Sequence, residues 1–381
     1  MSKSKLNIAF DAKRLYNNFT GLGNYSRTLV KSLVQYFPDY QYHLYTPKLK
    51  HNGETRPFLE YSQLQTHLPK TAFKNYWRTS SIKKDLQKAS IDIYHGLSHE
   101  IPIGIQKTNI KSIVTIHDLI IKRYPQYFPW LDRQIYDWKF RYACENADIV
   151  VAISESTKRD IMEFYEIPAE KIQVIYQTCH ERFKRLLSIQ ELKIIAQKYQ
   201  LPSHFYLYVG SIIPRKNLDK IVNALSLLPK GLQLPLVVIG NGKKYKQQVL
   251  EKVKKHQLED KIRFLTITYE DLPAFYQLAS LFLYPSAYEG FGLPILEALY
   301  SRTPVVSAKT SSLTEAGGSG AYYVERIDGE QLSDAIEKVM NDSVYQQQLI
   351  DAGQVHLIKF ESRKLSSALM KLYQNLISTR T

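Results

Sequence analysis

Short apolar runs rich in β-branched residues alternate along the chain with stretches whose apolar residues recur at helical spacing. In the first half, runs such as SIVTI and DIVVAIS predict strands at 6–10, 92–96, 112–116, 148–154 and 172–176. The amphipathic stretches between them predict helices over 22–36, 130–146 and 155–165. Ser154 is the expected N-cap of the last of these helices, because a serine side chain can accept a hydrogen bond from a free backbone N–H there.

The second half repeats this order. Strands at 205–210 and 235–240 lead into helices near 217–228 and 243–256, and further strands follow in IRFL, LFLYP, PVVSA and AYYV. Such alternation is typical of parallel sheets with helices on both faces. We therefore expect the α/β class, with two Rossmann-like doubly wound domains, 1–180 and 181–361, facing each other across a cleft. Residues 362–381 are expected to form a helix that packs back on the first domain.

The composition is that of an ordinary globular protein, with 44% hydrophobic and 23% charged residues among 381. No apolar run approaches the roughly 20 residues of a membrane-spanning helix, and no secretory leader is recognisable. The two cysteines, Cys144 and Cys179, lie in apolar surroundings and are expected to be structural. A cytoplasmic protein, with possible attachment to the inner face of the membrane, is the resulting expectation.

The net charge of +15 is spread over both halves, but it is most concentrated in residues 45–90, which carry 9 basic and 3 acidic side chains. Within this region, FKNYWR (73–78) mixes aromatic with basic residues. This mixture suits an anionic membrane, a lipid-linked acceptor or nucleic acid. An evenly solvated basic surface, with FKNYWR as an amphipathic helix packed on its own domain, is the open alternative.

The segment YPSAYEGFGLPILEALYSRTPVV (284–306) carries the most specific chemistry. A strand ends at Tyr284, a glycine-containing loop follows, and Pro294 is well placed as the first residue of a helix. Glycines allow close approach of a ligand, and the free N–H groups of a helix start attract anions. Glu289 would face a bound sugar, and Glu297, near the first turn, could accept both hydroxyls of a ribose. The alternative is a turn followed by a helix with two solvated glutamates.

The spacing E-G-F-G-L-P-I-L-E resembles the E-x7-E signature of glycosyltransferase family 4, a family of retaining enzymes with the two-domain GT-B fold. TGLGNYSR, VTIHDL, VAISESTKRDI, YVGSIIPRKNL and VVIGNG carry the resemblance over nearly the whole chain. It implies a nucleoside-diphosphate sugar as donor substrate and no cofactor. It also implies a saccharide or lipid-linked saccharide acceptor, and no nucleic-acid partner.

The segment YVGSIIPRKN ends the first strand of the second domain. Arg215 and Lys216 could neutralise a diphosphate whose charge grows as it leaves, and the family resemblance gives them this role. The family often has a further arginine near Ser211, and its absence makes Arg215 the expected substitute. A helix-start basic pair facing solvent is the alternative. No Asp-x-Asp metal motif occurs, so we expect no metal.

The resemblance assigns further residues to the donor site. The catalytic group would be His117, Lys216 and Glu289. His117 would contact the donor sugar, although a core histidine is the alternative. Donor binding would involve the glycine-containing loops, the base-flanking residues and the helix start, namely Gly21, Gly23, Gly210, Gly240, Ile267, Leu272, Gly290, Phe291, Gly292 and Leu293. Gly21 and Gly23 are expected to form a phosphate-tolerant loop. The family often has a glycine near Thr266, so this chain departs from the pattern beside Ile267.

The resulting hypothesis is transfer of a hexose, of mannose or glucose type, in the synthesis of a bacterial surface polysaccharide. No residue is a convincing covalent nucleophile, which favours attack by the acceptor on the face that the diphosphate leaves. An epimerase or hydrolase on the same fold is an alternative that only products can separate. An NAD(P) enzyme would need the third glycine of the G-x-G-x-x-G fingerprint, which Ser26 replaces. A basic nucleic-acid-binding protein would leave the two glutamates unexplained.

Overall fold

The computed structural model describes residues 6–378, and the chain forms two compact units. The first unit runs to Thr178 and resumes at Phe360, so that it contains the C-terminal helix. The second unit covers Cys179–Lys359. The second unit is therefore inserted, in sequence, between two parts of the first. The prediction of two Rossmann-like α/β domains is confirmed by the sheets described below.

The first unit is built on a seven-stranded parallel sheet of order β3-β2-β1-β4-β5-β6-β7. Its central strands are apolar and buried, as expected for a sheet with helices on both faces. The order reverses between β1 and β4, where chain connections leave the sheet on opposite sides. The strands are β1 Asn7–Asp11, β2 Gln41–Tyr45, β3 Leu64–His67, β4 Ile93–Gly96, β5 Lys111–Ile116, β6 Ile149–Ala152 and β7 Ile172–Val174.

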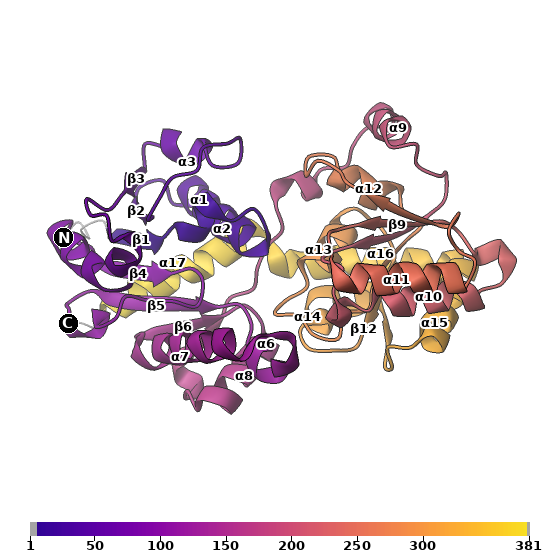
Figure 1. Ribbon diagram of the computed structural model, residues 1–381. Helices are drawn as coiled ribbons and strands as arrows, with labels where there is room; N and C mark the ends of the chain where they lie inside the picture. The colour runs from indigo at the N-terminus through magenta and orange to yellow at the C-terminus, as the bar shows by residue number, and fades with distance from the viewer. Residues whose placement is uncertain (1–5, 379–381) are drawn as a thin grey trace. The chain divides into compact units, whose positions relative to one another are not determined.

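Helices cover this sheet, with α7 and α8 on the opposite side from α2 (Figure 1). The C-terminal helix α17 packs against α2, and its Tyr373 hydroxyl is hydrogen-bonded to His95 of β4 at 2.7 Å. The helices of the first unit are α1 Lys13–Asn17, α2 Gly21–Tyr36, α3 Pro57–Glu60, α4 Lys74–Tyr76, the π-helical turn η1 Trp77–Ser81, α5 Ile82–Lys88, α6 Ile120–Arg123, α7 Trp130–Asn146, α8 Glu155–Tyr165 and α17 Ser362–Ser378.

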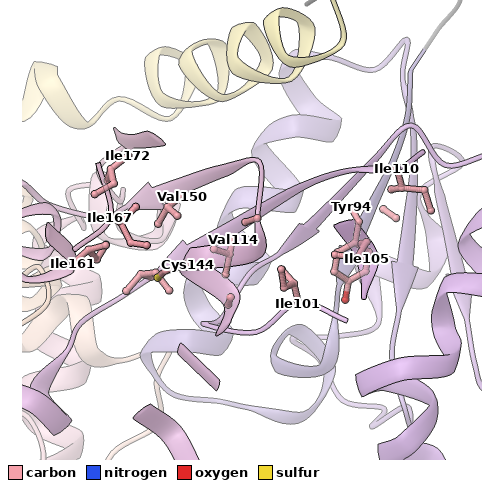
Figure 2. Packing of buried hydrophobic residues seen from close by; sticks show 14 of the residues in the cluster. Tyr94, Ile101, Ile105, Ile110, Val114, Cys144, Val150, Ile161, Ile167 and Ile172 are labelled. Atoms are coloured by element: carbon pink, nitrogen blue, oxygen red, sulfur yellow. The ribbon is translucent and has the colours of Figure 1, made fainter. Parts of the chain in front are cut away.

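The core of the first unit lies between the sheet and the helices α5, α7 and α8. Figure 2 shows Val114 and Val150 of the sheet together with Cys144 of α7 and Ile161 of α8. All four are fully buried, and burial of each such aliphatic side chain contributes roughly 1.5–3 kcal/mol. Cys144 and Cys179 are both buried, and neither forms a disulfide within the part of the chain that the structure describes.

Helix α8 begins at the predicted cap. Ser154 is extended, and its side chain accepts a hydrogen bond from the backbone N–H of Thr157 at 2.9 Å. We expect Ser154→Ala to lower the free energy of unfolding by about 1 kcal/mol, because that N–H then lies buried without an acceptor. Chemical denaturation measures the change. The exposed Ser203 serves as control, and an equal effect of Ser203→Ala would contradict the capping role.

The second unit is built on a six-stranded parallel sheet of order β10-β9-β8-β11-β12-β13. The order reverses between the neighbouring strands β8 and β11. In doubly wound sheets, ligands bind outside the carboxyl ends of the strands at this point. The strands are β8 Tyr206–Val209, β9 Leu236–Ile239, β10 Ile262–Leu265, β11 Leu281–Tyr284, β12 Val305–Ala308 and β13 Tyr322–Val324.

The helices of the second unit follow its strands in alternation (Figure 1). They are α9 Ile189–Lys198, α10 Leu218–Leu227, α11 Lys244–Lys255, α12 Leu272–Leu278, α13 Leu293–Tyr300, α14 Leu313–Gly317, α15 Gly329–Asn341 and α16 Ser343–Leu357. The expected polar connector at 177–190 contains a short 3-10 helix, Glu181–Lys184, and runs into the start of α9.

The prediction that Gly21 and Gly23 form a loop is wrong, because both residues belong to the first turn of α2. The side chain of Asn18 accepts hydrogen bonds from the backbone N–H groups of Thr20, at 3.0 Å, and Gly23, at 3.1 Å. A Cβ atom on Gly23 would lie 1.7 Å from the backbone oxygen of Asn18. The close approach of the preceding turn therefore explains why position 23 has no side chain, and the donor contact of both glycines stays a prediction.

Candidate active site

The candidate donor site lies at the point where the sheet order of the second unit reverses. Arg215 and Lys216 follow β8, and Glu289 follows β11. Since β8 and β11 are parallel neighbours, the loops at their carboxyl ends meet. The structure thus brings Glu289 together with Arg215 and Lys216, which lie more than 70 positions earlier in the sequence.

Lys216 and Glu289 form the centre of this site. The Lys216 ammonium lies 2.5 Å from Oε1 of Glu289 and donates to the hydroxyl of Tyr284 at 2.5 Å. Lys216 is only 8% exposed. Burial lowers the pKa of Lys216, against the opposing effect of Glu289. Burial alone would raise the pKa of Glu289, but Lys216 and Arg215 outweigh it and hold this pKa below its usual value.

Arg215 completes the cluster from the other side. Its guanidinium donates to Oε1 of Glu289 at 2.7 Å and to the backbone oxygen of Tyr288. The Ser286 hydroxyl donates to the same carboxylate oxygen at 2.5 Å. Tyr284 and Ser286 were not predicted as site residues, although both lie in the same motif. One signal could have identified them: residues with hydroxyl groups flank the predicted glutamate at the end of a strand.

Serines of the loop before α14 hold the segment 289–291 in place. The Ser312 hydroxyl donates to the backbone oxygens of Glu289 and Phe291, both at 2.8 Å. Ser311 accepts from the backbone N–H of Glu289 at 2.9 Å. Gly292 then adopts a φ of 118°, which favours glycine, and immediately precedes α13. The predicted Gly290–Leu293 segment is therefore a fixed turn that leads into a helix start, an arrangement that can bind an anion through backbone N–H groups.

The predicted glycines after β8 and β9 pack against each other. Gly210 has a φ of 150° and Gly240 a φ of 159°. A Cβ on Gly240 would lie 1.8 Å from the backbone oxygen of Gly210. This close contact explains why position 240 is a glycine. It also holds the loop that contains Lys216 beside the loop that follows β9.

Glu297 is the fifth residue of α13, close to the predicted position near the first turn. It is 8% exposed and accepts a hydrogen bond from the Tyr276 hydroxyl at 2.8 Å. Burial raises its pKa to about 7. The base-flanking residues lie after β10, where Ile267 is half-buried and Leu272 begins α12 as a buried residue.

His117 lies at the carboxyl end of β5 in the first unit and is only 5% exposed. Its Nε2 donates to the backbone oxygen of Leu97 at 2.8 Å, and its Nδ1 faces the Gln177 amide at 3.4 Å. Burial and the neighbouring His99 lower its pKa to about 3, so the imidazole is neutral. The edge of the Tyr25 ring packs against it at 4.6 Å between centroids.

The FKNYWR segment has two different faces. Trp77 donates to Asp85 at 2.6 Å, and Arg78 pairs with Asp11 and with Glu100, so both side chains are buried in their own unit. Phe73 and Tyr76 are exposed. Asp11, at the end of β1, is thus engaged by Arg78.

Within residues 6–378, no group of three or more His, Cys, Asp or Glu side chains is arranged to hold a metal ion. In the same part of the chain, no helix is both long and apolar enough to cross a membrane.

Comparisons with known proteins agree with this architecture. The family model described as "Glycosyltransferase Family 4" matches residues 19–178, and that of "Glycosyl transferases group 1" matches residues 191–356. O-antigen chain mannosyltransferase B of Escherichia coli is 30% identical over 288 residues, which are 74% of each chain. O-antigen chain mannosyltransferase RfbU of Salmonella typhimurium is 26% identical over 63% of each chain. Anabaena HepE, solved in complex with UDP-glucose, is 14% identical and superposes over 97% of this chain and 100% of its own with a TM-score of 0.76.

Proposed function

We infer that this chain, which belongs to glycosyltransferase family 4, transfers a hexose from a nucleoside-diphosphate sugar to a saccharide acceptor and retains the anomeric configuration. The observation that carries this proposal is the cluster of Lys216, Arg215 and Glu289 beside the start of α13. Mannose is the hexose that we favour, because two similar curated proteins are O-antigen mannosyltransferases. The same relatives favour a role in bacterial surface polysaccharide synthesis.

In the proposed reaction, Lys216 stabilises the leaving diphosphate. An ammonium has three N–H groups, and Lys216 hydrogen-bonds Tyr284 and Glu289 in the described part of the chain. The remaining N–H is available for a phosphate oxygen. Because the cation is buried and already held in place, its effect on growing negative charge is much larger than in water. This arrangement supports a reaction that needs no metal or other cofactor.

Glu289 and the helix start complete the proposed donor site. Glu289 would orient the two cations and the hexose, and the backbone N–H groups of Gly290–Leu293 would bind the diphosphate and sugar. The carboxylate of Glu297 would accept both ribose hydroxyls. The acceptor hydroxyl would attack on the face that the diphosphate leaves, and a leaving phosphate oxygen would take its proton.

His117 is proposed to contact the donor sugar. Its one N–H donates to Leu97, so such a contact requires Nδ1 to accept from a sugar hydroxyl or Nε2 to change partner. The neutral state of the ring is compatible with either role. Contact of residues 45–90 with an anionic membrane stays a prediction. Cosedimentation with anionic vesicles tests it.

We expect one nucleoside diphosphate among UDP, GDP and ADP to raise the melting temperature by about 3 °C or more at a concentration near 100 Kd. The shift should be unchanged by EDTA, because the proposed diphosphate ligands are side-chain cations and backbone N–H groups. Differential scanning fluorimetry with and without EDTA measures it. No shift with any of the three would contradict the proposed donor site.

Product analysis is the second part of this test. With the stabilising nucleotide sugar and a saccharide acceptor, a transferase forms a new glycosidic bond with the anomeric configuration of the donor. Free hexose or an epimerised nucleotide as the main product would instead identify a hydrolase or an epimerase. A covalent glycosyl adduct on Glu289 would exclude same-face attack.

A further inference from the structure

An open hollow of about 1020 Å³ lies in the first unit, near the carboxyl ends of β1 and β2. It is outside the cluster that we assign to the donor. The lining residues that can contact a ligand through a charged, polar or aromatic side chain include Lys13, Asn17, Lys48, Phe73, Lys74 and Tyr76. They come from α1, from the segment after β2 and from the start of α4. Ligands of doubly wound sheets bind at this edge.

Two solvent-exposed aromatic rings lie at the edge of this hollow. Phe73 is 77% and Tyr76 64% exposed, although both are large apolar side chains. The next two residues, Trp77 and Arg78, anchor the same helical segment through Asp85, Asp11 and Glu100. The rings are thus presented by a fixed segment. Exposed apolar surface that borders a hollow is typical of a binding site.

Three cations surround the same space. The ammonium groups of Lys13, Lys48 and Lys74 make no hydrogen bond or ion pair with any residue that the structure describes. The nearby carboxylates of Asp11 and Glu100 are engaged by Arg78. Asp11 and Glu100 still act electrostatically on Lys13, whereas Lys48 and Lys74 have no carboxylate partner among the described residues, and an anionic ligand group would supply one.

Asn17 fixes the wall that carries two of these lysines. Its amide nitrogen donates to the backbone oxygens of Lys13, at 3.1 Å, and Lys48, at 3.0 Å. Its Oδ1 atom is buried and has no hydrogen-bond partner among the described residues. Buried polar atoms are rarely left unpaired, because each such loss costs about 1–3 kcal/mol. A hydroxyl donor from a ligand would relieve this cost.

We propose that this hollow binds an anionic saccharide, with a sugar ring against Phe73 and Tyr76 and its phosphate or carboxylate between Lys13, Lys48 and Lys74. The inference rests on the proposed function and specifies its acceptor: a saccharide that carries a negative charge close to a sugar ring. The charge can belong to the sugar itself, as in a uronic acid, or to a phosphate that joins the sugar to a carrier.

A concave site favours this ligand over a membrane surface. A helix that lies on a bilayer buries one apolar face in it, whereas these rings border a hollow whose wall holds polar Asn17 and Asn75. A sugar presents apolar C–H faces and hydroxyl groups together, and so matches both parts of the lining.

The test is saturation-transfer NMR with the full chain, carried out with a saturating nucleoside diphosphate so that the donor site is occupied. The probes are a hexose 1-phosphate, a hexuronic acid, the neutral hexose and inorganic phosphate. We expect one of the two anionic sugars to bind at least 10-fold more tightly than neutral hexose or phosphate, and which one binds identifies the source of the charge. Lys48→Ala with Lys74→Ala should weaken this binding by about 10-fold or more.

Lys84→Ala with Lys88→Ala is the matched control, because it removes two exposed lysines of α5 that do not line the hollow. It should change affinity less than twofold. Phe73→Ala with Tyr76→Ala should remove the advantage of the anionic sugar over phosphate. Unchanged sugar binding in both hollow variants would overturn the proposal, as would variants that lose only binding to anionic vesicles. Unchanged circular dichroism and an unchanged unfolding profile show that the variants fold, and absence of stabilisation by the nucleoside diphosphate in the wild type would refute the donor site instead.

Discussion

Replacing Lys216 with alanine should lower kcat by about 10²–10³-fold, the loss typical for removing one preorganised donor from a site of developing charge. The reason is its position: the ammonium is buried, is held by Tyr284 and Glu289, and has an N–H left for the diphosphate. The charge on the leaving group grows in the transition state, so kcat should fall more than donor affinity. Initial rates with varied donor concentration separate the two effects.

Lys216→Arg is the informative companion variant, since it keeps the charge but replaces a compact ammonium by a larger planar group. We expect it to recover only part of the rate. Lys220→Ala, which removes a more exposed lysine four residues later, is the control for loss of charge. If Lys216→Ala lowers only donor affinity and leaves kcat intact, Lys216 binds the ground state and the transition-state role is wrong.

Replacing Glu297 with glutamine should weaken donor binding by about 10–100-fold, because a carboxylate that accepts two ribose hydroxyls makes stronger hydrogen bonds than an amide. The same change should stabilise the free protein at high pH. Burial raises the pKa of Glu297 from 4.5 to about 7. Between these values the folded state holds a proton that the unfolded state has lost, so stability falls as pH rises through this window.

Above pH 7 the wild type should therefore be less stable by up to about 3 kcal/mol than it would be with an uncharged side chain at this position. Glu297→Gln should match the wild type near pH 5 and exceed it near pH 8, as measured by denaturation at both values. Donor affinity of the wild type should rise with pH through about 7, and that of the variant should not. Glu251→Gln, at an exposed position of α11, is the control, and equal pH profiles for the two variants would contradict the assignment.

Most of the fold was predictable, because its buried parallel strands are continuous apolar runs. Strands such as β5 and β11 lie within two residues of the predicted positions. The strands β2 and β3 were not predicted. Their sequences, QYHLY and LQTH, mix polar with apolar residues, since they lie at or next to the edge of the sheet, and the period-2 signal over four or five residues is weak.

The site was predictable by residue type but less so by geometry. Glu289 and Lys216 were identified from their motifs, yet their direct contact depends on β8 lying beside β11, a consequence of strand order that local patterns do not contain. Gly21 and Gly23 were assigned to a phosphate-tolerant loop between the first strand and the helix. The structure places them at a helix start, where the preceding turn approaches the backbone too closely for a side chain at Gly23.

The position of α17 has a consequence for the order in which the protein is made. The first unit needs Tyr373 to complete the hydrogen bond of His95, and α17 to cover α2. A ribosome synthesises the whole of Cys179–Lys359 before it reaches this helix. The second unit can therefore fold during translation, while the first, although it is begun earlier, stays incomplete until the last helix has emerged.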